Sequence, residues 1–148
     1  MSKLEIAPIT PTKKILSTLR KFHKKCFPKI SKYEDFPFPK DICYIARIGD
    51  KMVGMAMVHK NSPEEFFSRE LKIQEHAYLY NFAIHPDHRK KGYGITMFNK
   101  IKKYYKELNL AVDHNDIDVI KFYFKCNCRI VGKFGKEWVC MTSETRKK

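Results

Sequence analysis

The chain has 148 residues, of which 43% are hydrophobic and 14% aromatic, so it is a folded globule and one domain, 1–148, is expected. No apolar run approaches the roughly 18 residues of a membrane span, and the N-terminus lacks the apolar stretch of a signal peptide. The net charge of +14 is compatible with three kinds of binding partner: nucleic acid, an anionic membrane surface and an anionic cofactor.

Five scattered cysteines without a secretory signal indicate reduced thiols in an intracellular, cytoplasmic protein. Cys126 and Cys128 lie near His114, but this spacing fits no standard zinc ligand pair. We therefore predict no metal and no membrane partner.

The first third of the chain carries a strand signal and then a helix signal. Residues Leu4–Ile9 alternate as a strand does. Thr10 and Pro11 predict a helix N-cap and first helical residue, and Pro28 ends that helix. The apolar face of the helix comprises Ile15, Leu16, Leu19, Phe22 and Cys26.

The middle of the chain predicts three strands. Residues 29–41 form a loop or short helix, and 60–75 form a polar loop. Between them, Cys43–Ile48 and Met52–His59 predict two strands joined by a turn at 49–51. A central strand follows, in which alternation places four residues on one face: Tyr78, Tyr80, Phe82 and Ile84.

The last third predicts two helices and three strands. The first helix is Gly94–Leu108, with an inward face of Met97, Phe98, Ile101, Tyr104, Tyr105 and Leu108. The remaining elements are a strand at Leu110–Asp113, a helix at Asp116–Cys126 and a hairpin of Ile130–Phe134 with Glu137–Met141.

The segment between the central strand and the helix at Gly94 has the character of an anion site. Backbone N–H groups at a helix start are unpaired and carry partial positive charge. Gly92 and Gly94 allow close approach to the backbone, and three cations precede or adjoin them: Arg89, Lys90 and Lys91. The Walker and dinucleotide glycine patterns are absent, so the expected ligand is another phosphate or pyrophosphate compound.

Two segments resemble the GNAT superfamily of N-acetyltransferases. Arg89-Lys90-Lys91-Gly92-Tyr93-Gly94, after Ala83-Ile84-His85-Pro86, resembles the R-x-x-G-x-G core that binds acetyl-CoA. Residues 115–128 are similar to the closing segment of the family, with Phe122-Tyr123 in place and Asn127-Cys128 where the family has Gly-Phe. Asparagine is the best substitute for glycine at a left-handed helix end, so the turn can survive.

The resemblance implies an α/β (α+β) fold with a mixed, mostly antiparallel sheet flanked by helices. In it the central strand and the next strand splay apart to admit the pantetheine arm of acetyl-CoA, the co-substrate. A backbone N–H of the central strand polarises the thioester carbonyl. By position the cofactor-binding residues are Phe82, Ala83, Ile84, Arg89, Lys90, Lys91, Gly92, Tyr93, Gly94 and Asn115. The family asparagine would fall at Asp116, one residue after Asn115.

Of the catalytic residues that the resemblance implies, the general acid is present and the general base is not in its usual position. Tyr123 occupies the position of the general acid that protonates the leaving thiolate. Many relatives carry a glutamate on the central strand, where this chain has Tyr78 and Leu79. Glu75, His76 and His114 are the alternative bases, and transfer without a dedicated base also stays open.

The resemblance implies transfer to a primary amine, on a small molecule or a protein, by direct attack in a ternary complex. We expect a cationic acceptor such as a polyamine or lysine, because acidic residues gather in two segments: Glu34, Asp35, Asp41, Glu64, Glu65, Glu70 and Glu75. The missing strand carboxylate and the high charge favour an alternative, a non-catalytic basic module that binds nucleic acid or acyl-CoA. Nucleic acid is not expected as a partner of the enzyme.

Overall fold

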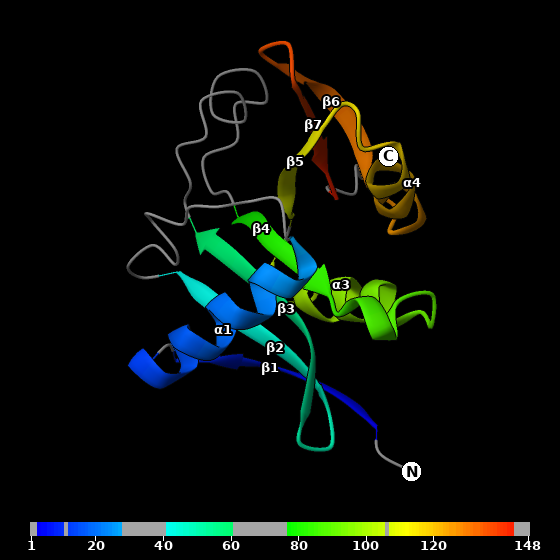
Figure 1. The fold of residues 1–148 in the computed structure, drawn as a ribbon. Coiled ribbons are helices and arrows are strands. Elements are labelled where there is room, and N and C mark those ends of the chain that lie inside the picture. The colour runs from blue at the N-terminus through cyan, green and yellow to red at the C-terminus, as the bar shows by residue number, and fades with distance from the viewer. Residues whose placement is uncertain (1–2, 11, 28–40, 61–76, 106, 144–148) are drawn as a thin grey trace. The chain divides into compact units, whose positions relative to one another are not determined.

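The computed structural model describes residues 3–10, 12–27, 41–60, 77–105 and 107–143. The elements in chain order (Figure 1) are β1 (Leu4–Ile9), α1 (Lys13–Cys26), β2 (Ile42–Ile48), β3 (Lys51–Lys60), β4 (Ala77–Ile84), η1 (Pro86–His88), α3 (Tyr93–Lys102), β5 (Asn109–Asp113), α4 (Ile117–Lys125), β6 (Arg129–Phe134) and β7 (Trp138–Thr142). Hydrogen-bonded neighbours give the strand order β1-β2-β3-β4-β5-β7-β6. Within these ranges no helix is long and apolar enough to cross a membrane.

The chain divides into two compact units. Unit 1 comprises Met1–His59 and Tyr80–Met97, and unit 2 comprises Lys60–Leu79 and Phe98–Lys148. The division falls inside β4 and inside α3, so each unit takes part of both elements.

In unit 1, helix α1 packs on one face of antiparallel strands β1, β2 and β3 (Figure 1). The core between them consists of Leu19, Phe22, Cys26, Cys43, Ile45, Met55, Met57 and Ala83. Ile15 and Leu16 pack against its margin, so the predicted apolar face of the first helix is confirmed. Complete burial of a side chain such as Leu19 stabilises the fold by about 2 kcal/mol.

The predicted start of this helix was wrong by two residues. Thr12, and not Thr10, is the N-cap, because its side-chain oxygen accepts a hydrogen bond from Ile15 N at 3.3 Å. Threonine is a good cap at either position, and the hydrogen bond to Ile15 N shows which of the two caps the helix.

Strand β4 does not keep one face along its length. Tyr80 and Ala83 both pack on the α1 core, although an odd spacing puts residues of a regular strand on opposite faces. Asn81 lies between them with a φ of 51°, a left-handed conformation that acts as a bulge. The prediction that Tyr80 and Ile84 share a face was therefore wrong: the Ile84 side chain faces Gly54, on the other side.

Helix α3 ends at Lys102, six residues before the predicted end. The chain continues in turns, in which Tyr104 N bonds to Ile101 O and Tyr105 N bonds to Lys102 O. Tyr104 is 54% exposed, so its predicted inward orientation was wrong. The other end of the predicted face is correct, because Leu108 is fully buried.

Unit 2 contains the antiparallel strands β5, β7 and β6, helix α4, and the first residues of β4. Tyr78 of β4 pairs in parallel with Asn109 of β5. At the end of α4, Asn127 has a φ of 64°, and Cys128 N bonds to Tyr123 O at 2.9 Å. This is a Schellman ending, so the prediction that Asn127 replaces the family glycine is confirmed.

Candidate active site

The loop between β4 and α3 provides donors for an anion. Lys90 and Gly92 have φ values of 63° and 82°, and Thr96 N makes the first helical bond to Gly92 O at 3.1 Å. The N–H groups before Thr96 in the first turn of α3 therefore have no intrahelical acceptor. Such groups, with the positive end of the helix dipole, bind phosphates.

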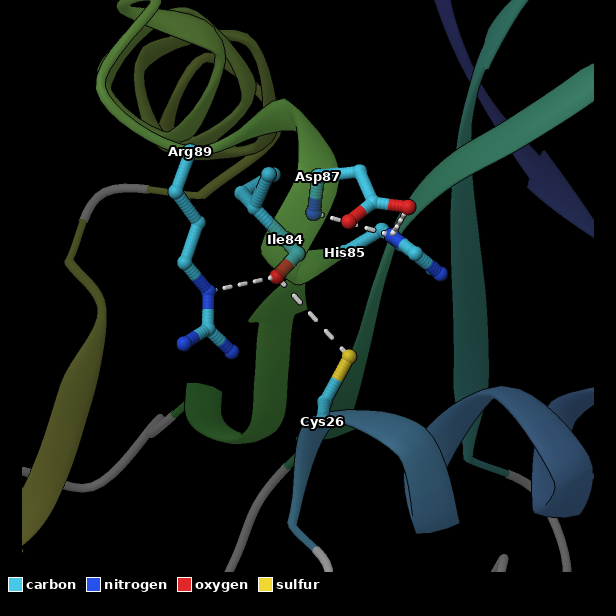
Figure 2. A network of polar contacts seen from close by, with 5 residues as sticks. All are labelled: Cys26, Ile84, His85, Asp87 and Arg89. Carbon is cyan, nitrogen blue, oxygen red and sulfur yellow. Dashed lines mark hydrogen bonds and ion pairs between the residues drawn. The ribbon is translucent and has the colours of Figure 1, made fainter.

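Hydrogen bonds tie this loop to the end of β4 (Figure 2). Arg89 Nε donates to the Ile84 carbonyl at 2.9 Å, and the Cys26 thiol donates to the same oxygen at 3.8 Å. His85 Nδ1 accepts from Asp87 N at 3.1 Å. The guanidinium of Arg89 is thus anchored at Nε, while its side chain stays exposed among the loop cations.

The loop surface is open at its glycine. A Cβ built on Gly92 meets nothing within 4 Å, and Arg89, Lys90 and Lys91 are all exposed. Free backbone donors, three cations and open space over the backbone together fit the diphosphate of a CoA compound. The chemistry of the residues is therefore compatible with the predicted co-substrate.

Beside this loop, the bulge in β4 is anchored to helix α1. His23 Nε2 bonds to Asn81 Oδ1 at 2.9 Å, and Asn81 Nδ2 donates to Met57 Sδ at 3.6 Å. Both contacts come from residues far away in the sequence. They hold the backbone next to Phe82, Ala83 and Ile84, whose strand carries the predicted donor to the thioester carbonyl.

Burial lowers the pKa of His23 below its ordinary value of 6.5, and this outweighs the opposing effect of the Asn81 hydrogen bond. Between the lowered pKa and 6.5, the unfolded chain binds a proton that the folded chain does not, so stability rises with pH in that window. We expect the free energy of unfolding to fall as the pH drops below about 6.5. Chemical denaturation at several pH values measures it.

Comparison with His23→Gln isolates this effect. The stability advantage of the wild type over His23→Gln should shrink on acidification, because glutamine does not titrate. The exposed His114 provides a matched control, and His114→Gln should follow the wild-type curve. Parallel curves for the wild type and His23→Gln would refute the assignment.

In unit 2, Tyr123 lies on the inner face of α4. It is buried, with its ring 6.0 Å from that of Phe98 and 5.1 Å from that of Phe122, both edge-on. Burial first, and then the neighbouring Cys128, raise the pKa of the phenol well above its ordinary value. Tyr123 therefore keeps its proton at neutral pH, as a proton donor must.

The other predicted residues of unit 2 lie in the turn after β5. Asn115 is exposed, and its N–H donates to Asp113 Oδ1 at 2.9 Å. His114 is exposed, and its N–H donates to the Glu137 carbonyl at 2.8 Å. The two other candidate bases, Glu75 and His76, lie outside the described residues.

The five cysteines all lie among the described residues, where they are buried and form no disulfide. Burial raises the pKa of Cys43 to about 11 and those of Cys126 and Cys128 to about 12 each. These groups are thiols at neutral pH and poor nucleophiles. In the part of the chain that the structure describes, no three His, Cys, Asp or Glu residues form a group that could hold a metal.

Sequence reasoning missed two groups of residues in unit 1. Asn81 had a signal, since asparagine is rare inside strands, but its partner His23 had none. A second group joins Asp41, Tyr80 and His59 by hydrogen bonds. Asp41 had been counted among the acidic residues that attract the acceptor, yet the structure buries it.

The mixed sheet, the basic loop at a helix start and the buried tyrosine define the class of a CoA-dependent acyltransferase. The profile of the Acetyltransferase (GNAT) family matches residues 12–127, and the chain belongs to this family. It is an acetyl-CoA-dependent N-acetyltransferase, as the family resemblance of the Arg89–Gly94 loop predicted.

Solved structures with low sequence identity share the fold. PH1933 from Pyrococcus horikoshii OT3 is 20% identical with a TM-score of 0.74, covering 98% of this chain and 100% of that one. Arabidopsis thaliana NAA60 in complex with a bisubstrate analogue is 17% identical with a TM-score of 0.73 and 95% coverage of both chains. The ribosomal-protein-S18-alanine N-acetyltransferase from Escherichia coli is 12% identical with a TM-score of 0.69, covering 99% and 97%. No curated protein matches the sequence as a relative.

Proposed function

We propose that this enzyme transfers the acetyl group of acetyl-CoA to a primary amine of a cationic acceptor, by direct attack in a ternary complex. The observation that supports it best is the Arg89–Gly94 loop at the start of α3, in a chain of the GNAT family. Being an enzyme, the protein is not the non-catalytic basic module that its charge had also suggested.

In this proposal each step of the transfer has a residue or backbone group that performs it. The loop from Arg89 to Gly94 holds the diphosphate through backbone N–H groups and cations. A backbone N–H of Phe82, Ala83 or Ile84 donates to the thioester oxygen as negative charge develops on it. The amine nitrogen forms a bond to the carbonyl carbon, the carbon–sulfur bond breaks, and Tyr123 gives its proton to the departing thiolate.

The proposed acceptor class rests on charge and on relatives. NAA60 was solved with a bisubstrate analogue, and the Escherichia coli relative is named for an alanine of ribosomal protein S18. The second name favours an amine carried on a protein. With Asp41 buried, the acidic attraction proposed here depends on six residues: Glu34, Asp35, Glu64, Glu65, Glu70 and Glu75.

A cationic acceptor predicts a salt-dependent KM. Three acceptors should be compared by CoA release: spermidine, a lysine-containing peptide with a free N-terminus, and an acidic peptide with the same N-terminus. Salt screens attraction over about 10 Å at 0.1 M, so the KM of the two cationic acceptors should rise several-fold between low and high salt. The acidic peptide should be the poorest substrate.

Neutralising variants test which acidic residues attract the cationic acceptor. The double variant Glu34→Gln with Asp35→Asn should raise the KM of the cationic acceptors and leave kcat nearly unchanged. The double variant Glu5→Gln with Asp50→Asn removes the same charge from exposed positions on β1 and in the β2–β3 turn, and should leave KM unchanged. A preference for the acidic peptide, or a KM that ignores both salt and Glu34, would contradict a cationic acceptor.

A further inference from the structure

A buried carboxylate joins three strands of unit 1. Asp41 precedes β2, His59 lies near the end of β3 and Tyr80 lies in β4. The antiparallel register that pairs Cys43 with Met57, continued by two residues, places Asp41 opposite His59. One carboxylate oxygen bonds to His59 Nδ1, and the other accepts the hydroxyl proton of Tyr80.

This carboxylate is costly to keep in the fold. The side chain of Asp41 is 1% exposed, and burying a charged carboxylate costs several kcal/mol unless it is paired. Here both oxygens have partners. Yet replacing a buried ionic group with apolar side chains is often neutral or stabilising, so stability alone does not account for Asp41.

The hydrogen bond to Asp41 determines how His59 can react. A neutral imidazole that donates its Nδ1 proton to a carboxylate carries its basic lone pair on Nε2. The carboxylate also fixes the orientation of the ring. The side chain of His59 is 32% exposed, so the ring is accessible to a proton donor in solution or in a bound substrate.

The group lies close to the segment of β4 proposed to hold the thioester carbonyl. Tyr80 stands two residues before Phe82, so their Cα atoms lie no more than about 7 Å apart. Tyr80 also packs on the α1 face of the sheet, to which Met57 of β3 belongs, and His59 follows Met57 by two residues. His59 and Tyr80 therefore share that face. A base from β3 would take the place of the strand carboxylate of relatives, where this chain has Tyr78 and Leu79.

We propose that His59 is the general base of the reaction and that Asp41 is its positioning residue. The inference rests on the proposed function. His59 Nε2 takes one proton from the acceptor ammonium, directly or through a water, which frees the nitrogen lone pair to attack. After the carbon–nitrogen bond forms, the nitrogen loses a second proton, which balances the proton that the thiolate receives; the imidazolium returns its own proton to solvent.

The other described imidazoles have different surroundings. Burial lowers the pKa of His23, whose Nε2 bonds to Asn81. Nδ1 of His85 accepts a backbone N–H, and the carboxylate nearest to it, that of Asp87, is exposed. His114 bonds to the Glu137 carbonyl and is exposed. Neither ring nitrogen of His88 makes a hydrogen bond within the described residues. Of the described histidines, His59 is the one whose Nδ1 bonds to a buried carboxylate.

The test compares His59→Gln with the control Arg47→Gln, at an exposed position of β2, using acetyl-CoA with spermidine and with the lysine-containing peptide. His59→Gln should lower kcat about a hundredfold, the lower end of the effect of one general base, and leave the Kd of acetyl-CoA unchanged. Arg47→Gln should resemble the wild type. Imidazole added to His59→Ala should restore part of the rate, a result that a purely structural histidine would not give.

Asp41 needs a readout that separates positioning from folding. Asp41→Asn keeps the shape but loses the charge that faces His59 Nδ1. It should lower kcat and leave the Kd of acetyl-CoA unchanged, and adding it to His59→Gln should cause little further loss, because the two residues act as one unit. Should Asp41→Asn fail to fold, Tyr80→Phe replaces it: that variant leaves the Asp41–His59 pair and should keep kcat within about tenfold of the wild-type value.

The outcomes separate the two proposals. An active wild type together with an equally active His59→Gln overturns the general base and leaves the proposed function standing. Absence of imidazole rescue in a folded His59→Ala that binds acetyl-CoA also overturns it. A wild type that releases no CoA with any amine overturns the proposed function and this inference together.

Discussion

Gly94→Glu should abolish acetyl-CoA binding, with a loss of affinity of at least about a hundredfold. Gly94 is the second residue of α3, in the turn whose N–H groups face the proposed diphosphate site. A glutamate there occupies the space of the ligand and sets a negative charge against its phosphates. Isothermal titration of acetyl-CoA into the variant measures the effect.

The same substitution should not weaken the fold, which makes the result decisive. Glutamate has a better helix propensity than glycine by up to about 1 kcal/mol, and an acidic side chain in the first turn favours the helix dipole. The melting temperature without ligand should therefore stay level or rise. Gly92 is a poorer probe, because its φ of 82° makes any side chain strain the loop.

A control for charge lies on the same helix. Asn99 is exposed on α3, and Asn99→Glu introduces the same charge one turn further on. It should reduce affinity only slightly, since the charge is farther from the proposed phosphates. Unchanged affinity in Gly94→Glu would show that the loop does not hold the diphosphate.

Most helices and strands were predicted correctly because their signals lie within the few residues that form each element. The face of α1 from Ile15 to Cys26 follows the helical period, and Asn127 was recognised because few residue types adopt the left-handed conformation. The predicted N-cap was misplaced because threonine is a good cap and stands on both sides of Pro11, at Thr10 and at Thr12. Only the side-chain hydrogen bond of Thr12 to Ile15 distinguishes them.

The irregular parts of the site depend on contacts between distant residues. Asn81 adopts its bulge in contact with His23, 58 positions earlier, so alternation alone predicted a regular strand. The pairing of Asp41 with His59 follows from the register of β2 with β3, which turn position fixes only to within a residue or two. The sequence shows Tyr78 and Leu79 where the resemblance implies a carboxylate on the central strand, and the structure brings Asp41, just before β2, to Tyr80 of that strand.

Tyr123→Phe should lower kcat by about ten- to a thousandfold with little change in the Kd of acetyl-CoA. This range overlaps the roughly hundred- to ten-thousandfold effect of a single general acid. The substitution removes the hydroxyl and keeps the ring in its contacts with Phe98 and Phe122, so the packing of α4 persists. Tyr104→Phe makes the same chemical change at an exposed position and should leave kcat at the wild-type value.

The raised pKa of Tyr123 adds a pH signature. Because burial keeps the phenol protonated beyond its ordinary pKa, ionisation of Tyr123 should cause no alkaline loss of activity below about pH 10. A wild-type rate that falls between pH 8 and 9, with the fall absent from Tyr123→Phe, would contradict this prediction.

The leaving group provides the sharpest test of the acid role. When the leaving thiol is more acidic, its thiolate departs more easily without being protonated. Proton transfer from Tyr123 therefore matters less for an acetyl donor with such a leaving group. With S-acetyl thiophenol in place of acetyl-CoA, the rate penalty of Tyr123→Phe should shrink toward unity, while that of His59→Gln, which acts on the amine, should persist. An equal penalty of Tyr123→Phe with both donors would mean that the hydroxyl supports the packing of α4 and gives no proton to sulfur.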